Sequence, residues 1–355
     1  MSEAQSQNLI ASLTPKDATR EEYAAVNAFW NQVQAETFPD DPPVPLEERI
    51  RRLQTIPATV DYRSWYAWRE GRSQVIAGAT VRFLLTGENR HLVDFEITVL
   101  PEYRRQGLAR RLLRHVVEVP RQEGRRLMMS WTTSTVPAGE AFLRHLGAQM
   151  GLATHTNQLD LHEVDRHLLE VWQARAAERA SGIDLGEWTQ GYPEEYIELV
   201  AAAFESMNRA PRGTLDLEDW HWTPAQIREF EASQRARGIE RWSMFTRDLA
   251  TGVLAGMTEV VWHPNRPTIV RQEMTGVLPA YQGRGLGRWL KAAMLEKILR
   301  ERPQVRWIRT GNADSNAAML KINRELGFKP FRSHWVWQIE TEKVLAYLEQ
   351  SAHRV

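Results

Sequence analysis

Two glycine-containing turns hold the residues of this chain whose types and spacing best suit chemistry. The first turn reads Arg104-Arg-Gln-Gly-Leu-Ala109 and the second reads Gln282-Gly-Arg-Gly-Leu-Gly287. The first backbone N–H groups of a helix have no intrahelical acceptor and carry partial positive charge, and glycine lets an anion approach them closely. Each turn therefore predicts a phosphate or pyrophosphate site, with Arg284 and Arg288 adding charge at the second. One such turn alone could equally be a plain strand-to-helix connection, but two in the same context favour the phosphate site.

The turns belong to a longer repeat. The segment 99–110 returns as 277–288, and both copies read Val-Leu-Pro-x-Tyr before the glycine turn. This repeat indicates that one ligand-binding domain occurs twice, and 355 residues suffice for two domains of roughly 150–180 residues. We therefore expect an N-terminal domain over 1–180 and a C-terminal domain over 181–355, joined after a charged, alanine-rich helix.

The elements around each turn follow one order in both halves. Early helices precede a β-hairpin, a strand, the helix after the glycine turn, a strand, a short helix, and a final strand and helix. The main expected segments are 92–100, 108–118, 126–132 and 157–161 in the first half, and 269–278, 286–300, 305–310 and 333–339 in the second. The pattern predicts an α/β fold of two tandem domains, each a mixed, mostly antiparallel sheet with one parallel pair and flanking helices.

The pattern Arg/Gln-x-x-Gly-x-Gly/Ala before an amphipathic helix resembles motif A of the GNAT superfamily of N-acetyltransferases. The residues that match it are Arg104, Gly107, Ala109, Gln282, Gly285 and Gly287. The segment 312–328 resembles the asparagine-rich helix of the same superfamily, which ends in Gly-Phe, here Gly327-Phe328. With two copies, the chain is similar to tandem GNAT proteins of the mycothiol-synthase type.

The resemblance implies acetyl-CoA as co-substrate, with its pyrophosphate on the second turn and its pantetheine along the strand before it. The residues assigned to the cofactor in this way are Thr275, Val277, Gln282, Gly283, Arg284, Gly285, Leu286, Gly287, Arg288, Asn312 and Asn316. In the first half, Arg104, Gly107 and Ala109 keep the turn and are assigned to cofactor binding in the same way. The positions that match Asn312, Asn316 and Asn323 are Thr132, Val136 and Leu143 there. We therefore expect a degenerate first half and a catalytic second half.

Acetyl transfer to an amine calls for a base, because an ammonium group with a pKa of about 10 must lose its proton before it attacks. Glu273, on the strand leading into the second turn, and Glu259, on the preceding strand, are the candidates, acting directly or through water. The alternative for each is a surface carboxylate paired with an arginine. The resemblance further implies an oxyanion donor among the backbone amides of 275–277, and a tyrosine acid four residues before the closing glycine. Asn323 stands at that position and cannot act as an acid, so water or another group serves, or the thiolate leaves unassisted.

Composition argues against several other classes of function. The chain has no cysteine, which removes disulfides, thiolate nucleophiles and cysteine-ligated metals, and no metal-binding motif is apparent. Net charge is zero, so no nucleic-acid footprint stands out. The polar first residues do not read as a signal peptide, and no apolar run approaches the roughly 20 residues that span a bilayer. We expect a cytoplasmic protein without metal, nucleic-acid or membrane partners; the oligomeric state stays open.

The favoured interpretation is an acetyl-CoA-dependent N-acetyltransferase that acts on a primary amine of a small molecule by direct attack in a ternary complex. A mycothiol-synthase-like or antibiotic-modifying acetylase is an alternative within the same class. A non-catalytic acyl-CoA-binding or regulatory protein is an alternative outside it, favoured by the missing tyrosine. A tandem aminoacyl transferase that uses charged tRNA would require a basic groove, against which the neutral charge argues.

Overall fold

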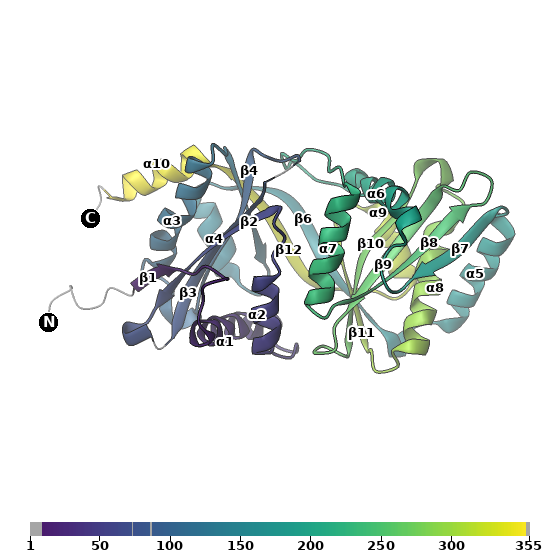
Figure 1. Ribbon diagram of the computed structural model, residues 1–355, viewed down its shortest axis with the longest axis horizontal. Coiled ribbons are helices and arrows are strands. Elements are labelled where there is room, and N and C mark those ends of the chain that lie inside the picture. The colour runs from purple at the N-terminus through teal and green to yellow at the C-terminus, as the bar shows by residue number, and fades with distance from the viewer. Residues whose placement is uncertain (1–8, 73, 86, 353–355) are drawn as a thin grey trace. The chain divides into compact units, whose positions relative to one another are not determined.

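The computed structural model describes residues 9–72, 74–85 and 87–352, and contacts between its residues divide the chain into two compact units (Figure 1). Unit 1 comprises residues 1–153, 213–218 and 334–355, and unit 2 comprises residues 154–212 and 219–333. The polar stretch at residues 1–7 lies outside the described residues. No helix in the described part of the chain is long and apolar enough to cross a membrane.

Unit 1 is built on a sheet in the order β1-β2-β3-β4-β5-β12. Its strands are β1 (Leu9–Ser12), β2 (Val60–Trp68), β3 (Val75–Leu84), β4 (Leu92–Val99), β5 (Leu127–Thr133) and β12 (Lys329–Glu340). Neighbouring strands are antiparallel except β4 and β5, which are parallel and place Asp94 opposite Met129. The helix between these two strands, α3 (Leu108–Gln122), is the crossover that a parallel pair requires.

Unit 2 repeats this arrangement in the order β6-β11-β10-β9-β8-β7. Its strands are β6 (Gln149–Asp160), β7 (Ile183–Trp188), β8 (Glu240–Asp248), β9 (Leu254–Trp262), β10 (Ile269–Val277) and β11 (Trp307–Ala313). Only β10 and β11 are parallel, and α8 (Leu286–Glu301) connects them. The mixed, mostly antiparallel sheets with flanking helices confirm the predicted fold class.

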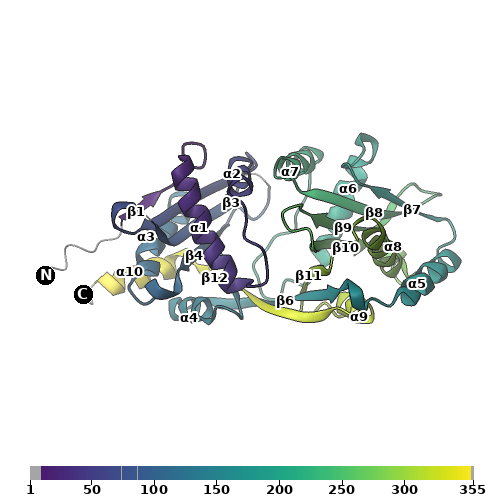
Figure 2. The same cartoon turned by 90° about the horizontal axis from the view of Figure 1, so that it is seen from below.

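Helices cover both faces of each sheet, because successive strand residues point to opposite sides. In unit 1, Tyr66 packs with α1 (Arg20–Thr37), whereas its neighbour Ala67 packs with α3, α4 (Pro137–Leu146) and α10 (Thr341–Ala352). Figure 2 shows α1, in purple, running across the strands, and α2 (Leu46–Gln54) contacts α1. In unit 2, α6 (Ile197–Phe204) and α7 (Pro224–Ala236) join one apolar cluster, and α5 (Arg166–Arg179) and α8 join another.

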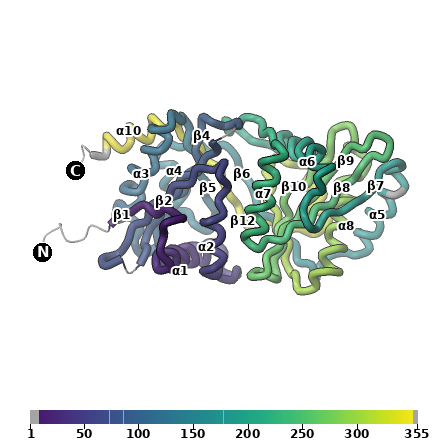
Figure 3. The backbone as a smooth tube through the Cα atoms, viewed as in Figure 1, coloured from purple at the N-terminus to yellow at the C-terminus, as the bar shows by residue number. Residues whose placement is uncertain are grey.

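The last strand and last helix of each half of the sequence belong to the other unit. β6 and α5 follow the first glycine turn in sequence, yet β6 pairs with β11 and α5 contacts α8, beside which it is drawn in teal in Figure 3. In exchange, β12 pairs with β5 and α10 contacts α3. The units defined by contacts therefore differ from a division at residues 180 and 181.

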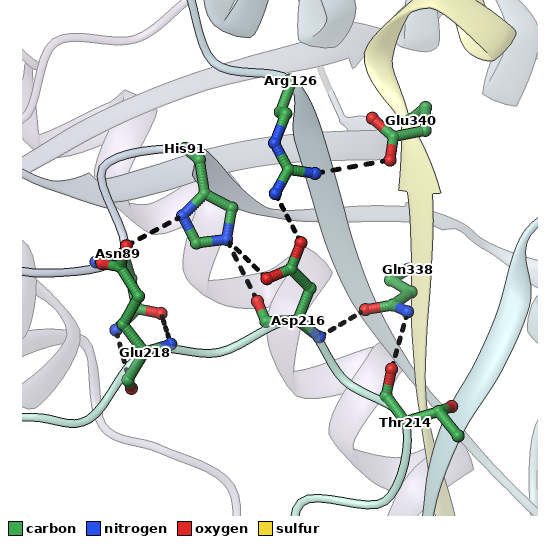
Figure 4. Close-up of polar contacts among 8 residues, drawn as sticks. All are labelled: Asn89, His91, Arg126, Thr214, Asp216, Glu218, Gln338 and Glu340. Carbon is green, nitrogen blue, oxygen red and sulfur yellow. Dashed lines mark hydrogen bonds and ion pairs between the residues drawn. The ribbon is translucent and has the colours of Figure 1, made fainter.

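A short segment between α6 and α7 also belongs to unit 1. Within residues 213–218, Asp216 accepts a hydrogen bond from Arg126 at 2.5 Å, and its backbone N–H donates to Gln338 at 3.0 Å (Figure 4). The backbone N–H of Glu218 donates to Asn89 at 2.9 Å, and the Glu218 carboxylate accepts from the backbone N–H of Asn89. The carboxylates of this segment thus have partners within unit 1.

Candidate functional site

The second glycine turn has the backbone of an anion cradle. After β10, the short 3-10 helix η7 (Pro279–Tyr281) leads to Gly283 and Gly285, whose φ angles are +79° and +87°. These left-handed conformations suit glycine, and a Cβ at either residue would meet no atom within 4 Å. Gly285 is the N-cap of α8, and no side chain accepts a hydrogen bond there. The first amides of α8 are therefore available to an anion.

These amides face a cavity of about 1090 Å³ in unit 2. Of the residues predicted to hold the cofactor, the structure places nine on the cavity wall: Thr275, Val277, Gln282, Gly283, Arg284, Gly285, Gly287, Arg288 and Asn316. The side chain of Leu286 is buried in the core behind the turn, so this residue offers only its backbone. Asn312 does not line the cavity.

The wall also shows why this end of β10 can accept a ligand. The pairing of β9 and β10 shifts register between Gln272 and Thr275, and the hydroxyls of Thr258 and Thr275 are 2.7 Å apart. A Cβ at Gly276 would lie only 2.3 Å from Oγ of Ser206, so the absence of a side chain lets the 3-10 helix η6 (Glu205–Arg209) close over the strand. The strand end and η6 together form one side of the cavity.

Charged residues at the turn differ in whether they already have partners. Arg288 donates to both carboxylate oxygens of Glu325 at 2.8 and 2.9 Å, which holds the pKa of Glu325 below its usual value. The guanidinium of Arg288 also lies 5.4 Å from the ring centre of Trp172. Arg284 has no carboxylate partner among the described residues and lies 5.2 Å from the ring centre of Tyr281.

Asn323 does not reach the cavity but takes part in a buried polar cluster. Its side-chain N–H donates to Asn312 at 2.7 Å, and its carbonyl oxygen accepts from the ammonium of Lys291 at 2.7 Å. Lys291 is buried, and burial lowers its pKa to about 7. The residues of the first half at the repeat-related positions are Leu113 and Leu143, both buried.

Neither predicted base lines the cavity. Glu259 is buried on β9 and accepts hydrogen bonds from Tyr192, Arg241 and Ser243, the last at 2.6 Å. Burial, reinforced by the Glu259 carboxylate, raises the pKa of Tyr192 well above its usual value. Glu273 is partly exposed on β10 and pairs with exposed Arg271 at 3.3 Å. Glu259 is therefore held by donors, whereas Glu273 is accessible to solvent.

The first turn keeps the same backbone form in unit 1. Gly107 is the N-cap of α3 with φ +79°, and Arg105 adopts φ +63° at the position equivalent to Gly283. Arg104 donates to the carbonyl of Val99 at 3.0 Å, as Gln282 does to Val277 at 3.1 Å, and it also binds Glu36 at 2.6 Å. The helix start at Val136, however, lacks the side-chain cap that Asn316 provides in unit 2.

Sequence reasoning missed the part of the wall that comes from outside the turn. α5 contributes Leu168, Trp172, Arg175, Ala176 and Arg179, and η6 with the following loop contributes Ser206, Met207, Arg209, Ala210 and Pro211. The helical spacing of the α5 residues is visible in the sequence, but nothing in the sequence indicates that α5, from the first half of the chain, packs on α8, from the second half. Within the described residues, no group of three or more His, Asp or Glu could hold a metal ion.

Comparison with known proteins places this geometry in a family. The model of the acetyltransferase (GNAT) family matches residues 27–148 and 213–328, so that each match contains one glycine turn. The chain belongs to the GNAT acetyltransferase family. It carries two tandem GNAT domains, as the repeat predicted.

Individual relatives agree with this assignment. The mycothiol acetyltransferase of Thermobifida fusca (strain YX) is 27% identical over 271 residues, which cover 74% of this chain and 78% of the relative. A tandem GNAT protein from the clavulanic acid biosynthesis pathway has a TM-score of 0.73 at 24% identity, covering 94% of this chain and 98% of its own. A GCN5-related N-acetyltransferase from Sphaerobacter thermophilus has a TM-score of 0.65 at 14% identity, covering 94% and 96%. The two solved structures share the fold.

Proposed function

We propose that this protein is an acetyl-CoA-dependent N-acetyltransferase that acetylates a primary amine of a small molecule in the cavity of unit 2. The observation that carries the proposal is the opening of the uncapped start of α8 into a cavity that also contains the end of β10 and Asn316. Backbone amides at a helix start favour a pyrophosphate, and a splayed strand end favours the amide groups of pantetheine. The cavity is large enough for the donor and an acceptor together.

In the proposed reaction, the neutral amine attacks the thioester carbonyl carbon and the C–S bond breaks as the amide forms. A backbone amide among residues 275–277 donates to the oxyanion. Glu273 takes the amine proton through water, because it is accessible, whereas three donors already hold the carboxylate of Glu259. CoA departs as a thiolate without a protein acid, which a thiol pKa of about 8.5 permits. Asn323 has no direct part in this reaction, because its side chain is hydrogen-bonded to Lys291 and Asn312 away from the cavity wall.

The proposal is tested by titrating acetyl-CoA into the full chain in a calorimeter and reading the stoichiometry. We expect one site per chain, lost on Gly285→Val and kept on the matched Gly107→Val. Two sites would mean that unit 1 also binds the donor, contrary to its proposed degeneracy. Absence of binding would remove acetyl-CoA from the reaction and with it the proposed function.

A second candidate function is that of a non-catalytic acyl-CoA-binding protein, favoured by Asn323 at the acid position and by the engagement of Glu325, the single carboxylate among the described lining residues, with Arg288. Steady-state turnover with a panel of amines, including aminoglycosides and the amine precursor of mycothiol, distinguishes the two. Release of free CoA only in the presence of an amine supports the acetyltransferase. Tight donor binding without turnover on any amine of the panel supports the binding protein.

A further inference from the structure

Two arginines of α5 face the cavity without an acidic partner. Arg175 and Arg179 are one helical turn apart on the side of α5 that also presents Leu168 and Trp172 to the wall. Both are exposed, and no ion pair involves either one in the part of the chain that the structure describes. By contrast, Arg306 in the same unit is also exposed but has the carboxylate of Asp160 at 3.3 Å.

The cavity wall as a whole carries an excess of positive charge. Five arginines line the cavity, and Glu325 is the single acidic residue among the described lining residues. Glu325 is occupied by Arg288, so its charge does not offset the others. The lining arginines that keep an unpaired charge are Arg175, Arg179, Arg209 and Arg284. A cavity with this excess attracts a ligand that carries several negative charges.

The unpaired arginines lie on separate elements, so a ligand that contacts all of them has more than one anionic group. Arg284 is in the glycine turn and adds to the backbone amides that suit a pyrophosphate. Arg175 and Arg179 lie on α5, which lines the same cavity but is distant from that turn in sequence. A second anionic group of the same ligand is therefore required to use them. A phosphomonoester suits them best, because it carries nearly two charges at pH 7 and guanidinium groups bind its oxygens in pairs.

We propose that Arg175 and Arg179 bind a phosphomonoester at the nucleotide end of the acyl donor, separate from its pyrophosphate. This proposal rests on the proposed function, under which that group is the 3′-phosphate of CoA. The binding site is thereby composite: the glycine turn comes from the second half of the sequence and the arginine pair from the first half. The strand β6 carries α5 to this place by pairing with β11.

Trp172, also on α5, contacts a charged residue of the same site. It is buried and lies beneath the guanidinium of Arg288, which is in turn fixed by Glu325. Helix α5 therefore both packs against Arg288 and supplies the unpaired guanidinium groups of Arg175 and Arg179. α5 thus has a role in donor binding beyond packing against α8.

The experiment compares acetyl-CoA with 3′-dephospho-acetyl-CoA on the full chain by calorimetry and by the KM of the donor. We expect the parent protein to prefer acetyl-CoA by about tenfold or more, as charge-assisted hydrogen bonds to a partly exposed phosphate allow. Arg175→Gln/Arg179→Gln should remove that preference and leave the affinity for the dephospho donor within about twofold. Arg166→Gln, on the same helix but off the cavity wall, is the matched control and should keep the full preference.

Other outcomes separate this inference from the proposed function. Equal binding of both donors by the parent protein would overturn the phosphomonoester site while leaving the acetyltransferase in place. Equal weakening of both donors by the double variant would do the same, because the arginines would then act on the pyrophosphate or on the fold. If neither donor binds the parent protein, both the inference and the proposed function fail. Partial retention of the preference in Arg175→Lys/Arg179→Lys would support charge recognition at this site.

Discussion

Lys291 is a buried ammonium with an amide partner in place of a carboxylate. Its neighbours within reach are the carbonyl oxygen of Asn323 at 2.7 Å and the ring of Phe328, whose centre lies 5.4 Å away. Burial without an opposite charge disfavours the protonated form, which is why its pKa falls to about 7. The repeat provides an internal comparison, since Leu113 and Leu143 fill the corresponding places in unit 1 with apolar side chains.

Replacing this pair by the residues of the first half, Lys291→Leu/Asn323→Leu, should stabilise the protein by about 1–4 kcal/mol at pH 7. The pKa of Lys291 is lower in the folded than in the unfolded chain, so the unfolded chain binds more protons between about 7 and the ordinary value of 10.5. The free energy of unfolding of the parent protein should therefore rise with pH across that window, by up to about 1.4 kcal/mol per pH unit, and the variant should lack this rise.

Urea denaturation between pH 6 and 9 measures this difference. The matched control is Lys297→Leu on the same helix: Lys297 is also buried, but Glu187 and Glu301 lie 3.1 and 2.9 Å from its ammonium. Its removal should not stabilise the protein, because it leaves Glu187 without its cation and Glu301 with Arg300 alone. A loss of stability in the Lys291→Leu/Asn323→Leu variant would show that the polar cluster contributes to folding after all.

Glu259 and Glu273 should respond to substitution in opposite ways. Glu259→Gln leaves Arg241 buried with a neutral partner and should lower the free energy of unfolding by about 2–4 kcal/mol. Glu273→Gln removes a partly exposed pair with Arg271 and should change stability by less than about 0.5 kcal/mol. Under the proposed function, Glu273→Gln lowers kcat by at least about tenfold and removes the acidic limb of its pH profile.

Thermal unfolding and the kcat of both variants against pH test this assignment together. If Glu259→Gln kept its stability and lost its activity, the base would be Glu259 and the assignment would reverse.

At the scale of elements, the two glycine turns show which glycines are required for a left-handed backbone conformation and which are required because another group packs closely against them. Gly287 has an ordinary helical backbone, and a Cβ there would lie 3.5 Å from Ile322, a normal contact. Its counterpart in the first turn is Ala109. Gly285 has φ +87°, which costs another residue roughly 1 kcal/mol or more. The turn therefore constrains Gly285 through its backbone more than Gly287.

We expect Gly287→Ala to keep the affinity for acetyl-CoA within about threefold and to leave the Tm within about 2 °C, because the added methyl group meets only ordinary contacts. Gly285→Ala should lower the Tm by several degrees through backbone strain. Calorimetric titration and thermal unfolding of the two variants check both effects. The reverse order, with Gly287→Ala the more damaging, would mean that the cofactor approaches the helix at Gly287 too closely for a methyl group.

Local sequence signals predicted these elements well. The helix expected over 286–300 is α8, Leu286–Glu301, and the crossover between parallel strands follows from its position. The helix after the first glycine turn, α3, extends past the predicted end at 118 to Gln122 and contains Pro120, which removes one backbone hydrogen bond without ending the helix. The nine residues predicted to bind the cofactor that line the cavity come from the end of β10, the glycine turn with the start of α8, and the start of the short helix after β11, all of which are local features.

The remainder of the site depends on contacts that local patterns do not encode. β6 and β12 occupy equivalent positions in the repeat, so the apolar pattern of either strand suits the same place in either sheet. Nothing local decides which copy each one joins, and the arginines of α5 could not be assigned to the cavity. The burial of Lys291 was missed for a related reason: lysines are seldom fully buried, and its burial depends on its packing against α9 (Ala317–Glu325).

At the scale of the whole molecule, the exchange makes each unit depend on both halves of the sequence. From the first half, β6, the short 3-10 helix η4 (Leu161–Glu163) and α5 supply four buried residues to the core of unit 2, which are Leu159, Leu161, Leu169 and Trp172. From the second half, β12 and α10 supply four to the core of unit 1, which are Trp337, Ile339, Val344 and Leu348. At about 1.5–3 kcal/mol for each buried side chain, either set contributes about 6–12 kcal/mol. That amount is comparable with the whole stability of a domain, about 5–15 kcal/mol.

The fragments 1–180 and 181–355 should therefore fail to fold when each is produced alone. Fragment 181–355 retains the glycine turn but lacks β6 and α5, which leaves β11 without one neighbour and α8 without its cover. We expect each fragment to be insoluble or to lack a cooperative thermal transition, and co-expression of the two to restore a soluble complex that binds acetyl-CoA. The control is the full chain cut at a protease site placed between Ser181 and Gly182, whose pieces should stay associated, because noncovalent contacts complete each unit. A fragment 181–355 that folds alone with the stability of the full chain would show that unit 2 does not require the exchanged elements.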